Sequence, residues 1–143
     1  MSGFSTYLDN KLIDHVFSGV SFETPSKYLA LFTASTGLDV NSGWENSELP
    51  STAAAYARVE LPHDIWSTAD NGETATLYDT QFAVANSHWG NVTHVGIMDS
   101  AIGGNVLAWG ALANPVTGVT ESRNIETGDQ LVVRAGALNV TLA

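Results

Sequence analysis

The chain has 143 residues, 44% of them apolar and 14% charged, with fifteen acidic and five basic residues and a net charge of −10. This length fits a single domain over residues 1–143 with its own hydrophobic core, and the absence of cysteine excludes disulfides, thiolate metal sites and cysteine nucleophiles. Nucleic acids and anionic membranes are bound through clustered cations, so the scattered basic residues argue against both as partners.

The amino-terminal segment has the period of an amphipathic helix. Ser5 or Thr6 can cap its start, and Gly19 predicts its end. Either the helix covers an open end of its own domain, or residues 1–19 form a docking element that packs on a partner. The apolar stripe of this helix consists of Phe4, Leu8, Leu12, Ile13, Val16 and Phe17.

The remainder of the chain is predicted to form short strands separated by polar loops. The turn signal Gly103-Gly104 joins two of the strands into a hairpin. One helix followed by these strands predicts a mainly all-β fold, an antiparallel β-sandwich or jelly-roll-like domain with one amino-terminal α-helix. The strand candidates, from their apolar or alternating residues, are 28–32, 56–61, 76–82, 92–98, 106–112, 131–134 and 138–143.

Two long polar loops are candidates for contact with another molecule. Residues 36–52 form an unusually long connection, and Trp44 stands alone in it. Either Trp44 is buried against another chain, or it folds back and pins its own loop. Residues 67–74 contain Asp70 and Asn71 followed by glycine, which is a strong turn signal. The candidate partner-binding residues are therefore Phe4, Leu8, Leu12, Trp44, Asp70 and Asn71.

No constellation of catalytic or metal-binding residues can be identified in the sequence. The four histidines lack the spacing of zinc sites, and neither a Gly-x-Ser-x-Gly motif nor a phosphate-binding glycine loop is present. The segment from Asp70 to Glu73 has only part of the acidic spacing of a calcium loop. We therefore expect no enzymatic activity, no cofactor and no dedicated metal site.

Several sequence blocks, taken in order, resemble a known family. They are YLALFT at 28–33, YARV at 56–59, WGNVTHVGI at 89–97, GGNVLAWG at 103–110, GD at 128–129 and AGAL at 135–138. Together they resemble small virion proteins of tailed bacteriophages that are described as head-decoration, cement or tail-fibre-like proteins. The resemblance covers nearly the whole chain, and its motifs are turns and strands, so it implies a fold and a virion location but no catalytic residues.

The resemblance implies a structural virion protein made in the cytoplasm of the bacterial host. Because the chain has neither the length nor the repeats of a fibre shaft, we expect a capsid decoration (cement) protein that stabilises the outer surface of the assembled head by binding it. The expected partners are the major capsid protein and further copies of this chain, as a trimer or dimer. The alternatives are a tail- or fibre-associated accessory protein that contacts the host receptor, and a small enzyme or lectin-like module unrelated to a virion.

Overall fold

The main sheet of the protein has five antiparallel strands. In a computed structural model, which describes residues 3–49, 55–114 and 116–142, the order across this sheet is β1 (Gly3–Phe4), β8 (Val106–Ala111), β7 (His94–Met98), β2 (Tyr28–Phe32) and β3 (Val59–Glu60). The helices are α1 (Thr6–Phe17) and two short 3₁₀ helices, η1 (Trp44–Asn46) and η2 (His63–Ile65).

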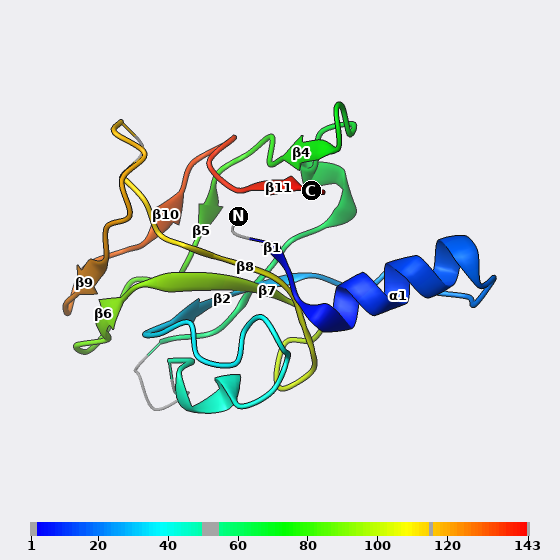
Figure 1. Cartoon of the computed structure of the whole chain (residues 1–143). Helices are drawn as coiled ribbons and strands as arrows, with labels where there is room; N and C mark the ends of the chain where they lie inside the picture. The colour runs from blue at the N-terminus through cyan, green and yellow to red at the C-terminus, as the bar shows by residue number, and fades with distance from the viewer. Residues whose placement is uncertain (1–2, 50–54, 115, 143) are drawn as a thin grey trace.

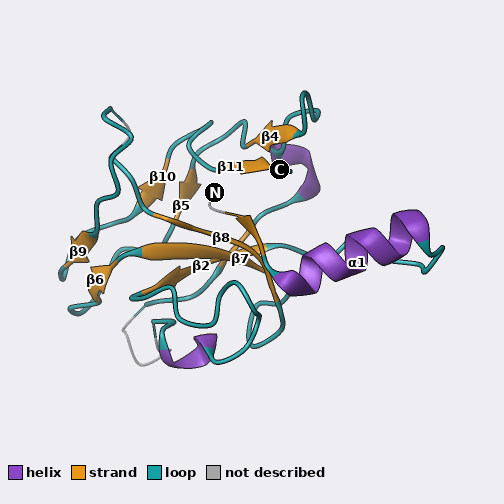
Figure 2. Ribbon diagram, viewed as in Figure 1, coloured by secondary structure: helices purple, strands orange, loops and turns teal. Residues whose placement is uncertain are grey.

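Among the described residues, three two-stranded antiparallel pairs complete the fold. Figures 1 and 2 show two of these pairs over one face of the main sheet, with the long loop and η1 on the opposite side. The predicted fold class, a mainly-β, sandwich-like antiparallel fold with one α-helix, is therefore confirmed. The pairs are β5 (Thr80–Gln81) with β10 (Val132–Val133), β4 (Glu73–Ala75) with β11 (Asn139–Thr141), and β6 (Gly90–Val92) with β9 (Arg123–Ile125).

Strand β2 supplies side chains to both hydrophobic clusters. Successive side chains of a strand point to opposite faces, so Leu29 and Leu31 enter one cluster, while Ala30 and Phe32 enter the other. All four of these residues are completely buried. The main sheet is therefore covered on both faces, by the strand pairs on one side and by the loop that follows β2 on the other.

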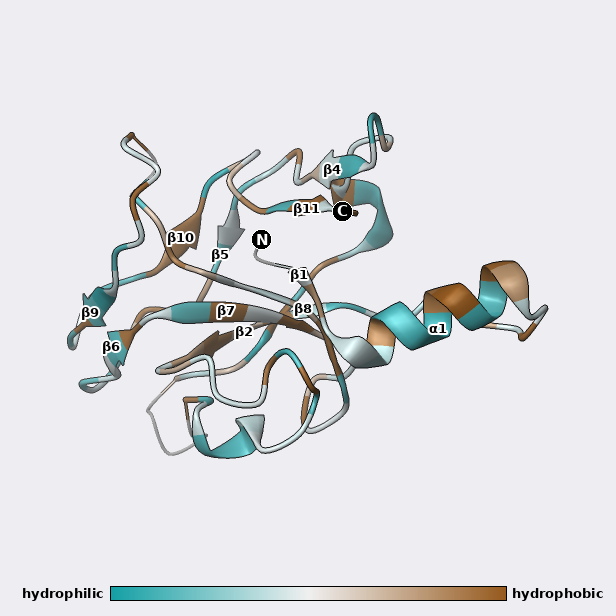
Figure 3. Ribbon diagram, viewed as in Figure 1, coloured by the Kyte–Doolittle hydropathy of each residue, from teal (hydrophilic) through white to brown (hydrophobic). Residues whose placement is uncertain are grey.

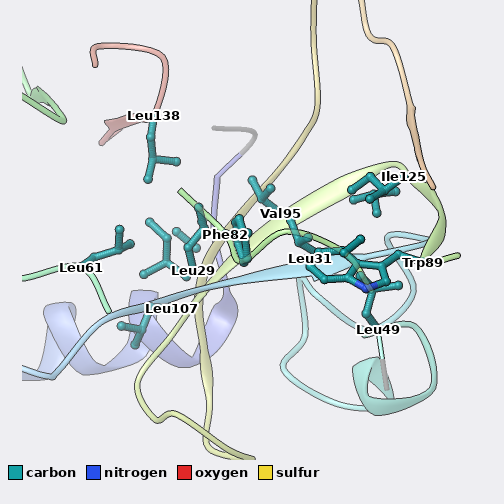
Figure 4. Close-up of a cluster of buried hydrophobic side chains, with 14 residues drawn as sticks. Leu29, Leu31, Leu49, Leu61, Phe82, Trp89, Val95, Leu107, Ile125 and Leu138 are labelled. Carbon is teal, nitrogen blue, oxygen red and sulfur yellow. The ribbon is translucent and has the colours of Figure 1, made fainter. Parts of the chain in front are cut away.

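The larger cluster lies between the main sheet and the segments that carry the strand pairs (Figure 4). Leu29 and Leu31 meet Phe82, Trp89 and Leu138 there, and each of the five is at most 5% exposed. Burying a large apolar side chain stabilises a fold by about 1.5–3 kcal/mol. This cluster is therefore the main source of cohesion between the two layers.

Helix α1 begins and ends where the sequence predicts. Ser5 is the N-cap residue, and its Oγ accepts a hydrogen bond of 3.2 Å from the backbone N–H of Leu8. Gly19 adopts a left-handed φ of 70° just after the helix. Phe4, which the sequence analysis counts in the apolar stripe of the helix, precedes the helix and pairs with Ala108 as part of β1. The segment before the helix is thus part of the sheet, and it cannot be removed without loss of an edge strand.

The structure corrects several predicted strands, at places where other contacts replace the backbone hydrogen bonds between strands. Of residues 56–61, only β3 forms, because the preceding side chains turn to Glu48. Of residues 76–82, only β5 forms, because Leu77 and Tyr78 are exposed. The remaining differences are a break at Thr93 between β6 and β7, shorter strands at β8, β10 and β11, and three strands that were not predicted, β1, β4 and β9.

The long connection after β2 is confirmed as a loop as far as residue 49, with η1 as its only helical turn among the described residues. Three parts of the predictions lie outside the described residues: residues 50–52 of the long loop, residue 115 of the polar loop between the strand candidates 106–112 and 131–134, and residue 143 of the last strand candidate.

A substitution at Gly96 tests the packing of the smaller hydrophobic cluster, which contains Phe32. A Cβ atom at Gly96 would lie 2.8 Å from Cε2 of Phe32, so we expect Gly96→Ala to lower the free energy of unfolding by about 1–3 kcal/mol. Urea denaturation measures this loss. The same substitution in a Phe32→Leu background should cost less, because the ring edge is gone. Equal losses in the two backgrounds would contradict the contact.

Candidate functional site: an apolar groove beside the amino-terminal helix

Helix α1 carries an apolar end that the described part of the chain leaves uncovered. None of its residues is buried, and Ile13, Val16 and Phe17 are 56%, 67% and 82% exposed. Figure 1 shows the helix projecting from the sheets, and Figure 3 shows hydrophobic residues near its free end. Grouped exposed apolar side chains mark interaction surfaces, so this end of α1 is suited to contact with another molecule.

An apolar groove of about 390 Å³ lies between α1 and the sheets. Leu8 and Leu12 contribute to it from the helix, Leu107 from the main sheet, and Trp66 from the segment after η2. The sequence thus places apolar residues from three separate parts of the fold around one hollow. The complete lining is Phe4, Leu8, Leu12, Phe22, Pro25, Lys27, His63, Trp66, Thr74, Ile97, Leu107, Ala108 and Val140.

The groove contains one lysine and one histidine, which contact each other. Nζ of Lys27 donates hydrogen bonds to Nδ1 of His63 at 2.7 Å and to the carbonyl oxygen of Pro25 at 3.3 Å. Partial burial lowers the pKa of Lys27. None of the ion pairs among the described residues involves Lys27. Lys27 therefore lines the apolar groove as a half-buried residue, its contact with His63 is exposed to solvent, and its ammonium group has no carboxylate partner among the described residues.

Trp44 lies in the core and not on the surface. It is 4% exposed, and its ring meets that of Phe32 edge to face at 6.3 Å. The guanidinium of Arg58 lies 5.5 Å from the centre of the Trp44 ring. Of the two interpretations left open by the sequence, the structure has the one in which Trp44 pins its own loop.

Glu48 and Arg58 form a buried ion pair that the sequence did not indicate. Nε and Nη2 of Arg58 donate to the two carboxylate oxygens of Glu48 at 2.8 and 2.7 Å, and the two side chains are only 4% and 14% exposed. Nη1 donates to the carbonyl oxygens of Ser100 and Gly103 at 2.7 and 2.8 Å. The hydroxyl of Tyr56 donates to Glu48 at 2.7 Å. With its donors used in this way, Arg58 joins the long loop to the β7–β8 turn.

The pKa values in this network follow from burial and from the charge of Glu48. The pKa of Tyr56 is raised strongly, first by burial and then by the neighbouring carboxylate. Burial acts to lower the pKa of Arg58, but the hydrogen bonds and charge of Glu48 outweigh it and the pKa is raised. Both shifts reflect a network of buried side chains that holds loops together.

Asp70 and Asn71 form the tight turn that the sequence predicts. Asn71 and Gly72 have left-handed φ angles of 52° and 74°, and backbone hydrogen bonds of 2.9 and 3.0 Å join Asp70 to Glu73. Thr74 lines both the groove and the small polar hollow beside this turn. The turn is therefore a neighbour of the groove.

The structure thus divides the predicted partner-binding residues among three places. Phe4, Leu8 and Leu12 line the groove, the two turn residues lie beside it, and the tryptophan is in the core. Sequence reasoning missed Lys27 and His63, because two residues 36 positions apart form no local motif.

Two structural findings concern membranes and metals. Within residues 3–49, 55–114 and 116–142, no helix has the length and apolar character needed to cross a bilayer. The same residues contain no group of three or more His, Asp or Glu side chains placed to hold a metal ion.

The mainly-β fold agrees with the class that the sequence resemblance implies, and the comparison with protein families supports that class: the chain is a structural protein of a bacteriophage virion. More particularly, the family model described as podophage GP4 fiber I protein gp80 matches residues 3–141, and the chain belongs to this family. No curated protein matches the chain. The predicted virion location is confirmed, while the family description names a fibre protein and not a head-decoration protein.

Replacing Glu48 by glutamine removes the counter-ion of a buried guanidinium. We expect Glu48→Gln to lower the free energy of unfolding by about 3 kcal/mol, measured by urea denaturation. Glu45 is an exposed neighbour, so Glu45→Gln removes the same charge and should change stability by less than about 0.5 kcal/mol. Similar small changes in both variants would contradict a structural role for the ion pair.

The exposed end of α1 should contribute little to the stability of the isolated chain. We expect Phe17→Ser to change the free energy of unfolding by less than about 0.5 kcal/mol, because Phe17 is 82% exposed. Leu107→Ala, at a residue 4% exposed, should cost about 2–5 kcal/mol. Thermal and urea denaturation compare the two variants. A loss above about 1 kcal/mol for Phe17→Ser would mean that the helix end packs on its own domain.

Proposed function

We propose that the protein is a component of the tail fibres of a podophage and acts by binding its neighbours in the fibre, without catalysis. The observation that carries this proposal is the match of residues 3–141 to a family described as a fibre protein. The match covers nearly the whole chain, so the described groove and helix lie within the matched part.

The structure supports a binding function through two surfaces of one region. The exposed end of α1 offers Val16 and Phe17 to a partner, and the adjacent groove offers an apolar hollow. Several modest contacts of this kind in a repeated assembly gain strength by multivalency. Further copies of this chain, as a dimer or trimer, belong to the proposal as partners for the exposed end of α1.

The net charge of −10 argues against direct contact with an anionic host surface. An acidic protein is repelled by other anionic surfaces. In this proposal the protein therefore joins fibre subunits, and receptor contact is left to other chains.

Decoration of the capsid exterior, through the major capsid protein, is the second candidate function. The observation that favours it is the short chain without repeats, which suits a small domain that coats a surface. The family description supports the fibre instead, and the two functions differ in position and copy number.

Quantitative mass spectrometry of purified virions, with the major capsid protein as internal reference, tests the proposal. We expect a few to a few dozen copies per particle, together with immunogold labelling at the tail. Hundreds of copies with labelling over the head would favour decoration. Absence of the protein from purified particles would contradict both candidates.

A further inference from the structure

We propose that the groove beside α1 binds an apolar segment of a different virion protein, and that a carboxylate of this segment pairs with Lys27. The inference rests on the proposed function, because it takes the partner to be a neighbour in the fibre. It adds the chemistry of that partner and the residue that recognises it.

The first observation is the ammonium group in the groove. Lys27 is held by the carbonyl of Pro25 and by Nδ1 of His63, and both of these groups only accept its protons. Neither contact neutralises the positive charge. A cation that is partly withdrawn from water is stabilised most by an anion with good hydrogen-bond geometry. The complement to Lys27 is therefore a carboxylate supplied from outside the described residues.

The second observation is the apolar character of the remaining lining. Leu8, Leu12 and Phe22 surround the hollow, together with Leu107 and other sheet residues. Apolar surface removed from water contributes about 25 cal/mol per Å². A polar side chain placed among these residues would lose its hydrogen bonds to water. The segment that fits this groove thus presents apolar side chains and a single acid at the lysine.

The third observation is the charge of the chain as a whole. Fifteen acidic residues face five basic ones, so the surface repels acidic partners except near a local cation. Lys27 makes the groove such a place, and His63 beside it holds the amine in position. A second copy of this chain would bring the same threefold excess of acids to one ammonium group. A different chain that carries one acid in an apolar segment avoids that repulsion.

The chain contains only two lysines, and this makes a sharp test available. Lys11 is exposed on α1 and lies 5.6 Å from the ring of Tyr7, whereas Lys27 lies in the groove. An amine-reactive acetylating reagent is applied to the isolated chain and to purified virions. We expect Lys27 to be acetylated in the isolated chain and protected at least about tenfold in virions, with Lys11 as the internal control.

A carbodiimide then identifies the partner group in the same virions. This reagent joins an amine to a carboxylate in direct contact through an amide bond, and it takes up the released water as a urea. We expect mass spectrometry to find Lys27 linked to an Asp or Glu within an apolar stretch of another virion protein. The variants Lys27→Met and Lys11→Met remove the same charge, and only Lys27→Met should lower the number of copies per particle.

The outcomes separate this inference from the proposed function. Equal acetylation of Lys27 in the isolated chain and in virions that contain the protein would overturn the inference and leave the fibre function intact. A cross-link from Lys27 to a second copy of this chain would overturn the identity of the occupant. Absence of the chain from virions would overturn the proposed function, and the inference with it.

Discussion

Strand β2 must be buried on both of its faces, and much of the structure follows from this requirement. One face needs the cover that the strand pairs provide through Phe82 and Leu138. The other needs Leu38 and Trp44, which only a long loop can bring back onto Phe32. A loop of that length loses much conformational entropy when it is ordered, so it requires anchors of its own. The buried ion pair between Glu48 and Arg58 is one of these anchors.

The parts of the fold that sequence reasoning recovered are those with local signals. The helix shows an apolar period and a cap at Ser5, β2 shows an uninterrupted apolar run, and the β7–β8 hairpin shows paired glycines. Strands of two or three residues, such as β4 and β9, carry no such signal, because their partner strands define them. The same reason hid the Lys27–His63 contact, which brings together two residues 36 positions apart.

The polar side chains of the protein fall into two groups with different consequences. In the network around Arg58, every named donor has an acceptor within the chain, and such satisfied networks hold one arrangement of loops. At Lys27 the hydrogen bonds are made, but the charge has no counter-ion among the described residues. The first group stabilises the fold. The second group, at Lys27, is the place where the proposed partner binds. Both groups contain a basic side chain, so the difference between them comes from which groups lie near that side chain in the fold and not from its residue type.

The absence of buried residues in α1 has a consequence for its dynamics. A helix of 12 residues that makes few tertiary contacts is only marginally stable in water, so its outer turns can open and close while the sheets remain folded. A partner that covers Val16 and Phe17 would then order this segment as it binds, and part of the binding free energy would offset the lost conformational freedom. Attachment through α1 would accordingly be coupled to local folding, and this coupling lets it be specific and still reversible.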